Sequence, residues 1–264
     1  MGRIEKVFSE LRKKKEKALV AYLTAGYPDL AASRDLILAL HAAGTDVLEL
    51  GVPFSDPTAD GPAIQKASQE ALQNGTTLSR VLSLVGDLRS STDMPMVLFS
   101  YYNPIFSFGN RRFAREAAEA GADGVLVVDL PLEEAAELKK YTDPAGLDFI
   151  SLVAPTTGAE RSKKIVEAAS GFIYYVSLTG VTGEGKPPLE EIREKVSQIK
   201  RETELPVVAG FGISTPEEAG EIAAVADGVV VGSAFIRLIG KHPDRQIMKE
   251  AVGTFAQRLK RAIV

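Results

Sequence analysis

The sequence predicts a closed (β/α)8 barrel of the TIM type, in which eight parallel strands are surrounded by helices. Short apolar or β-branched runs alternate with amphipathic stretches along the whole chain, a pattern typical of parallel strands joined by crossover helices. The chain has 264 residues, close to the ~250 of many such barrels. No linker divides it, so we expect a single barrel domain over residues 1–264, with an open doubly wound sheet as the alternative.

Eight runs have the composition of buried strands. They are Leu19–Leu23, Asp46–Leu50, Met96–Ser100, Gly124–Val128, Asp148–Leu152, Phe172–Ser177, Pro206–Ala209 and Gly228–Val231. The amphipathic stretches between them are Ala31–Ala43, Ala63–Gln73, Arg112–Ala120, Glu133–Tyr141, Glu160–Ala169, Leu189–Lys200 and Pro216–Ala226. Start signals such as Ser214-Thr215-Pro216, and glycines such as Gly44 and Gly121 at the ends, support these helices.

Further helices are expected beyond the basic pattern. Apolar residues recur at helical spacing in the charged segment 1–17, which predicts an extra N-terminal helix. The second unit has enough sequence over 75–91 for an additional helix, and the eighth unit carries a short helical stretch and then another over about 244–262.

The N-terminal segment also raises the possibility of a secretory signal, because basic residues precede the apolar run 18–23. Glu5, Glu10 and Glu16 and the shortness of that run favour an amphipathic helix followed by a strand. No apolar run approaches the ~20 residues of a membrane-spanning helix. We therefore expect a cytoplasmic protein with no membrane partner.

Composition excludes several classes of function. A formal net charge of -4 argues against nucleic-acid binding as the main task. The chain has no cysteine, which rules out thiolate nucleophiles and cysteine-based metal sites. Its two histidines, His41 and His242, have no metal-ligand spacing. We expect no metal site.

Two acids mark a candidate active site. Glu49 interrupts the apolar strand run 46–50, where a carboxylate loses hydration and must be hydrogen-bonded, protonated or functional. Asp60 follows in a loop rich in proline, glycine and aspartate. Active sites of this fold lie at the carboxyl ends of the strands and in the loops that follow them. Both acids are predicted on that face.

Glycines near the end of the chain predict a phosphate site. Gly210-Phe211-Gly212 follows the seventh strand and Gly232-Ser233 follows the eighth, just before a short helical stretch. Exposed backbone amides and the start of a helix favour an anion, and barrels frequently bind phosphate between these two loops. A glycine-rich loop, 179–185, can add Gly183. The alternative is that the glycines only make tight turns.

These motifs identify a family. Leu48-Glu49-Leu50-Gly51-Val52-Pro53-Phe54-Ser55-Asp56-Pro57-Thr58-Ala59-Asp60-Gly61-Pro62 resembles the α subunit of tryptophan synthase, as do, in order along the chain, Tyr101-Tyr102-Asn103-Pro104, Val127-Val128-Asp129-Leu130-Pro131, Gly180-Val181-Thr182-Gly183, Gly210-Phe211-Gly212-Ile213 and Gly232-Ser233-Ala234. The long first motif is highly specific, whereas other phosphate-binding barrels share the glycine motifs.

The resemblance implies a lyase of tryptophan biosynthesis that cleaves indole-3-glycerol phosphate to indole and glyceraldehyde 3-phosphate. It implies that Glu49 is the general acid/base and that Asp60 engages the indole N–H. No cofactor is implied for this chain. Pyridoxal phosphate is expected only in a partner β subunit, within an α2β2 heterotetramer. The apolar run Val52-Pro53-Phe54, expected on an exposed loop, is a hint of that interface.

The resemblance also implies the residues that bind the substrate. The indole slot is expected to be lined by Tyr22, Phe99, Leu126, Val128, Tyr174, Phe211 and Val230, with Thr182 able to bond Asp60. The phosphate is expected at Gly183, Gly212, Gly232 and Ser233. Whether Tyr174 or Tyr175 faces the site stays open, and Phe99, Leu126 and Val230 also suit plain barrel interior. Asp129 is expected to cap the helix that follows it.

Two other functions remain as alternatives. One is a different sugar-phosphate barrel enzyme, although such enzymes usually have a lysine at a strand end and no expected strand ends in one. The other is a non-catalytic subunit that only activates its partner, which the presence of both Glu49 and Asp60 argues against.

Overall fold

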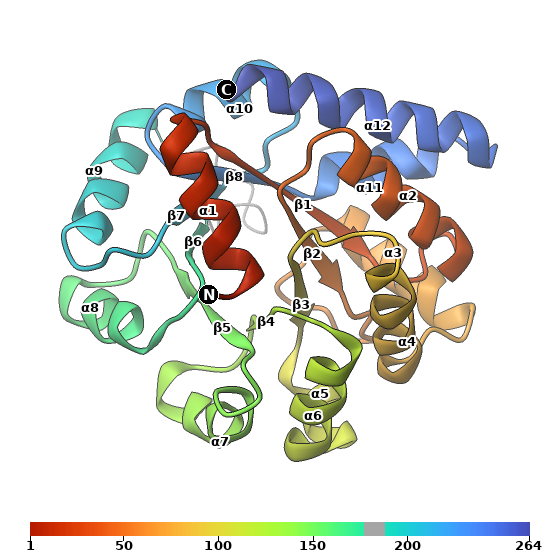
Figure 1. Cartoon of the computed structure of the whole chain (residues 1–264), viewed down its shortest axis with the longest axis horizontal. Coiled ribbons are helices and arrows are strands. Elements are labelled where there is room, and N and C mark those ends of the chain that lie inside the picture. The colour runs from red at the N-terminus through yellow and green to blue at the C-terminus, as the bar shows by residue number, and fades with distance from the viewer. Residues whose placement is uncertain (177–187) are drawn as a thin grey trace.

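The computed structural model of the chain, which describes residues 1–176 and 188–264, is a closed parallel barrel in which each strand pairs with the next and β8 pairs with β1 (Figure 1). The strands are β1 (Ala18–Thr24), β2 (Val47–Gly51), β3 (Met96–Ser100), β4 (Gly124–Val127), β5 (Asp148–Val153), β6 (Ile173–Val176), β7 (Val207–Gly210) and β8 (Gly228–Val231). The predicted fold is confirmed, and the strands begin and end within two residues of their predicted bounds wherever the structure describes them.

Helices surround the barrel on its outside, except α1, which lies across one mouth (Figure 1). They are α1 (Arg3–Lys14), α2 (Leu30–Ala42), α3 (Pro62–Gln73), α4 (Leu78–Arg89), α5 (Tyr102–Phe108), α6 (Asn110–Ala120), α7 (Leu132–Thr142), α8 (Ala159–Ala168), α9 (Leu189–Lys200), α10 (Pro216–Ala223), α11 (Ser233–Lys241) and α12 (Arg245–Ala262). The extra helices before β1 and in the second and eighth units are confirmed as α1, α4 and the pair α11 and α12. None of the described helices is both long and apolar enough to cross a membrane.

One helix was not predicted. The third unit contains α5, only seven residues long, before α6. Pro104 lies in its first turn, where a missing N–H costs no hydrogen bond. The Asp129 carboxylate accepts the backbone N–H of Tyr102 at 2.7 Å. The expectation that Asp129 caps the following helix was wrong, because it serves the start of α5 instead.

Alternate residues of the strands fill the barrel interior. Val20, Val47, Val97, Leu126 and Ile150 belong to one buried cluster with Ile4, Phe8 and Leu11 of α1. The ring of Phe8 lies 5.7 Å from that of Phe172, so α1 closes the amino-terminal mouth of the barrel (Figure 1). The residues between them, such as Leu19 and Leu48, face outward and pack beneath the helices. The opposite mouth is therefore the one available for a site.

A buried ion pair fastens the amino-terminal ends of β3 and β4. The Asp123 carboxylate accepts Arg89 at 2.6 Å, Arg3 at 3.0 Å and the backbone N–H of Met96 at 2.8 Å. Asp123→Ala leaves the half-buried Arg89 guanidinium without its carboxylate partner, and we expect the free energy of unfolding to fall by about 3 kcal/mol. Urea denaturation at pH 7 measures this loss.

The exposed ion pair beside it provides the matched control. Arg3 also approaches Asp93 at 3.8 Å, and the Asp93 side chain is 96% exposed. Asp93→Ala should change the stability by less than about 1 kcal/mol. Equal losses for the two variants would contradict the role given to Asp123.

Candidate active site

Glu49 lies inside the barrel. Within β2, Leu48 and Leu50 face the helices, so Val47 and Glu49 face inward, and Glu49 pairs in register with Tyr22 of β1 and Val97 of β3. Because β2 extends to Gly51, Glu49 is the middle residue of the strand rather than the penultimate one. The sequence therefore places a carboxylate among apolar strand residues, two positions below the carboxyl end.

The environment of Glu49 keeps its proton bound. The residue is 1% exposed, and its Oε1 atom has no hydrogen-bond partner in the described part of the protein. Burial raises the pKa of Glu49 to about 8, because the apolar surroundings disfavour the charged form. At neutral pH the side chain is mostly a carboxylic acid, which can donate a proton.

Asp60 lies in the loop between β2 and α3 and has a different environment. It is 8% exposed, and its Oδ2 accepts a hydrogen bond from the Tyr101 hydroxyl at 3.1 Å. Burial raises the pKa of Asp60 to about 6, and the Tyr101 hydrogen bond opposes that rise. At neutral pH Asp60 is mostly ionised and can accept a proton or a hydrogen bond.

Tyr22 and Tyr174 each interact electrostatically with both acids. Burial raises the pKa of each hydroxyl, and the charges of both Glu49 and Asp60 add to that rise. Tyr174 belongs to the interior cluster, whereas Tyr175 points outward. The geometry thus answers the question that the sequence left open, since Tyr174 is the tyrosine on the side of the acids.

Most residues expected around the indole come together in the barrel interior. Phe99, Leu126, Val128, Tyr174 and Val230 share one interior cluster. The ring of Tyr22 meets that of Phe99 edge to face at 5.1 Å, an arrangement that aromatic rings prefer. Phe211 does not belong to that cluster, and its ring lies 5.1 Å from that of outward-facing Tyr175.

Three of the expected phosphate residues, Gly212, Gly232 and Ser233, lie at the same mouth. Gly212 adopts a φ of +64°, and a Cβ at this position would meet nothing within 4 Å, so the backbone is open to a ligand. Gly232 is the N-cap of α11 and has no side-chain cap, which leaves the first-turn amides available. A Cβ on Gly232 would lie 3.3 Å from Cβ of Tyr22. Tyr22, which pairs in register with Glu49, therefore also lies beside Gly232.

Two expected site residues, Thr182 and Gly183, lie outside the described residues. The expectation that the apolar run 52–54 is exposed was wrong. Val52 and Pro53 are buried, and half-buried Phe54 packs its ring against Tyr101 at 5.1 Å. Sequence reasoning also did not single out Tyr101 as a site residue, although it directly follows β3 within a family motif.

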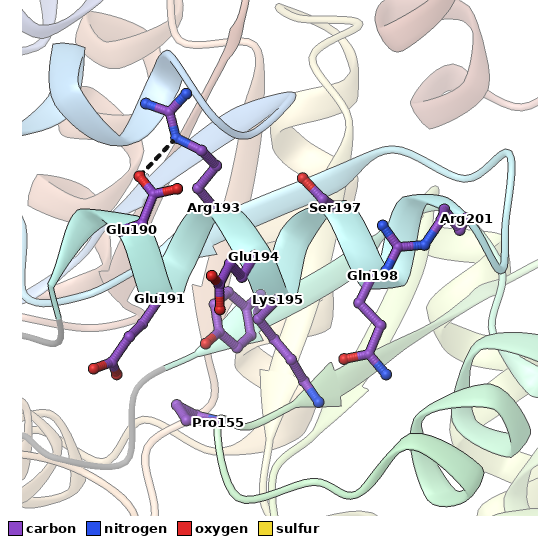
Figure 2. A pocket seen from close by; sticks show the side chains of 10 residues that line it. Pro155, Glu190, Glu191, Arg193, Glu194, Lys195, Ser197, Gln198 and Arg201 are labelled. Atoms are coloured by element: carbon purple, nitrogen blue, oxygen red, sulfur yellow. Dashed lines mark ion pairs between the residues drawn. The ribbon is translucent and has the colours of Figure 1, made fainter.

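A cleft on the outside of the barrel does not have the features of a catalytic site. It has a volume of about 640 Å³ and lies along α9 beside Pro155. Figure 2 shows that the labelled charged side chains of α9 point in several directions rather than toward one point. Glu190 pairs with Arg193 at 3.4 Å, and the Lys195 ammonium donates to the Thr157 carbonyl at 2.6 Å. These charges are consistent with a solvated helix face.

Comparison with known proteins identifies a family. Residues 8–264 match the family described as "Tryptophan synthase alpha chain". The tryptophan synthase alpha chain of Citrifermentans bemidjiense is 51% identical over 264 residues, covering 100% of this chain and 98% of the relative. That of Desulfatibacillum aliphaticivorans is 52% identical over 262 residues, covering 99% of each.

Solved structures give the same result. Tryptophan synthase subunit alpha from Legionella pneumophila superposes with a TM-score of 0.92 at 40% identity, covering 100% of this chain and 98% of that one. A chain of tryptophan synthase from M. tuberculosis in an aminoacrylate-bound form gives 0.89 at 32% identity, with 100% of both chains covered. From its sequence, its barrel and these relatives, the chain belongs to the tryptophan synthase alpha chain family.

Proposed function

We propose that Glu49 and Asp60 together catalyse the lyase reaction of this family, the cleavage of indole-3-glycerol phosphate to indole and glyceraldehyde 3-phosphate. One observation carries the proposal: two buried acids at one mouth of the barrel have pKa values of about 8 and about 6. At neutral pH one is therefore protonated and the other ionised, which assigns a proton donor and a proton acceptor.

The reaction needs four proton transfers. The Glu49 acid donates a proton to the indole carbon that bears the side chain, while Asp60 accepts a hydrogen bond from the ring N–H and then its proton. The ionised Glu49 next removes the proton of the neighbouring side-chain hydroxyl. The electrons of that O–H bond form the aldehyde, and the carbon–carbon bond breaks toward the indole ring. The proton on Asp60 returns to the ring nitrogen as aromaticity is restored, so both acids end as they began.

The surroundings fit a substrate with an apolar ring and a charged tail. We propose that Tyr22, Phe99, Tyr174 and their apolar neighbours hold the indole, which also excludes water from the proton transfers. The amides at Gly212, Gly232 and Ser233 would bind the phosphate, which the positive end of α11 favours. Phe211, Thr182 and Gly183 remain proposed members of the site.

We further propose that the chain works as the α subunit of an α2β2 complex, with pyridoxal phosphate bound only in the β subunit. The decisive experiment is incubation with indole-3-glycerol phosphate, with and without a β subunit. Because the substrate carries the same indole ring, the product indole is separated from it by liquid chromatography and quantified by its absorbance. Absence of indole in both reactions would refute the proposed function.

Gly212→Asp should weaken the binding of glycerol 3-phosphate by at least about tenfold, because it places a carboxylate where the phosphate is proposed to bind. Isothermal titration calorimetry measures the change. Gly212→Asn is the matched control, because asparagine has the same shape and also tolerates the positive φ of +64° at this position. Equal affinity for the two variants would show that a charge at residue 212 does not affect phosphate binding, and would contradict the proposed phosphate site.

A further inference from the structure

The Tyr101 hydroxyl makes two hydrogen bonds to the loop between β2 and α3, which carries Asp60. It follows β3 directly and is 3% exposed. The hydroxyl accepts the backbone N–H of Ala59 at 2.9 Å and donates to Oδ2 of Asp60 at 3.1 Å. Because one bond uses the hydroxyl as an acceptor and the other as a donor, the two together fix the direction of its proton. That proton points at the Asp60 carboxylate.

The rest of Tyr101 is fixed by the same loop. Its ring packs against Phe54, near the start of the loop, with the centroids 5.1 Å apart. The loop is otherwise tied by the Val52 N–H to the Phe99 carbonyl at 2.8 Å and by the Gln65 amide to the Asp60 carbonyl at 2.9 Å. Both of these bonds fix main-chain atoms. Among the described residues, Tyr101 is the donor of the hydrogen bond to the Asp60 carboxylate itself.

We propose that Tyr101 is a positioning residue for the cleavage reaction, which orients the Asp60 carboxylate toward the ring N–H and keeps it ionised. This inference rests on the proposed function, in which Asp60 accepts that proton. Tyr101 does not transfer a proton to or from the substrate. It acts through Asp60, and its effect should therefore appear as a change in the pH dependence of the reaction.

The charges around Asp60 determine the sign of that change. Burial raises the pKa of Asp60 to about 6, and among the described residues the hydrogen bond from Tyr101 lowers it. Tyr22 of β1 and Tyr174 of β6 also face Asp60, and both stay neutral because burial raises their pKa values. Glu49 of β2 acts on the same two tyrosines and is protonated at neutral pH. Without the Tyr101 hydroxyl, the pKa of Asp60 should therefore rise further.

Tyr101→Phe tests the proposal, because it keeps the ring against Phe54 and removes both hydrogen bonds. We expect kcat/KM for indole release at pH 7 to fall about tenfold. The acidic limb of its pH profile, where activity rises as Asp60 ionises, should move to higher pH. The affinity for glycerol 3-phosphate should not change, because the phosphate residues lie on other loops.

Two variants separate positioning from packing. Tyr102→Phe removes the neighbouring hydroxyl, which accepts the Asn110 amide at 2.8 Å, and should leave the pH profile unchanged. Phe54→Leu removes the ring contact but keeps the Tyr101 hydroxyl, and should shift the acidic limb less than Tyr101→Phe does. A loss in Tyr101→Phe that is equal at every pH, together with a lower melting temperature, would mean a purely structural role and would overturn the inference.

A second measurement distinguishes failure of the inference from failure of the proposed function. Carbon NMR of protein labelled at its aspartate carboxyl groups follows the titration of Asp60 without any substrate. Tyr101→Phe should raise the midpoint of that titration. An inactive wild-type protein would refute the proposed function, whereas an unchanged Asp60 midpoint would refute the role of Tyr101 even in an active enzyme.

Discussion

Glu49→Gln should lower the rate of indole release by about 10³- to 10⁴-fold, the upper range for loss of a general acid/base. Glutamine has the shape of the protonated acid that fills this position but has no proton to transfer. Binding of glycerol 3-phosphate should be unchanged, because the phosphate residues belong to the last two units of the barrel. Chromatographic quantification of released indole and calorimetry measure the two quantities.

The same substitution should stabilise the protein at alkaline pH. The pKa of Glu49 is raised by burial from 4.5 to about 8, so the unfolded chain ionises first and gains stability relative to the fold as pH rises from about 4.5 to about 8. The wild type loses stability over this window, and Glu49→Gln does not. We expect the variant to be more stable by one to a few kcal/mol above pH 8, roughly 1.4 kcal/mol for each pKa unit. Near-normal turnover, or an identical pH dependence of stability, would contradict the assignment of Glu49.

The barrel and the position of Glu49 could be predicted because each depends on a local pattern. Strand runs alternating with amphipathic stretches specify a parallel sheet, and the alternation within β2 places Glu49 opposite Leu48 and Leu50. An acid at an inward position has few roles other than chemistry. The conclusion therefore needed the chain order and the strand period but no contact distances.

Other features depend on contacts that the pattern does not contain. The helix α5 is short, and Pro104 in its first turn resembles a turn signal, so nothing in the local sequence separates a seven-residue helix from a loop. Phe211 directly follows the last residue of β7, where the strand period no longer fixes the direction of a side chain, and its ring packs on Tyr175. The bond between Tyr101 and Asp60 joins residues 41 positions apart. Only the folded arrangement of β2 and β3 brings them together.

Asp60→Asn should reduce kcat/KM by about 10²- to 10³-fold and remove the acidic limb of its pH profile. The wild-type profile should be bell-shaped, because activity rises as Asp60 ionises near pH 6 and falls as Glu49 ionises near pH 8. Asparagine can still accept the Tyr101 hydrogen bond through its carbonyl oxygen, so the geometry of the loop is kept. It carries no charge and cannot take up a proton.

The control for this variant lies in the same loop. Asp56 is exposed, and its hydrogen-bond partner is the adjacent Ser55 hydroxyl, so Asp56→Asn should leave the pH profile of the isolated chain unchanged. An acidic limb that persists in Asp60→Asn would mean that another group must ionise for catalysis, and the division of labour between the two acids would then be wrong. Loss of that limb in Asp60→Asn alone would place the ionised acceptor at Asp60, because the two substitutions remove the same charge from the same loop.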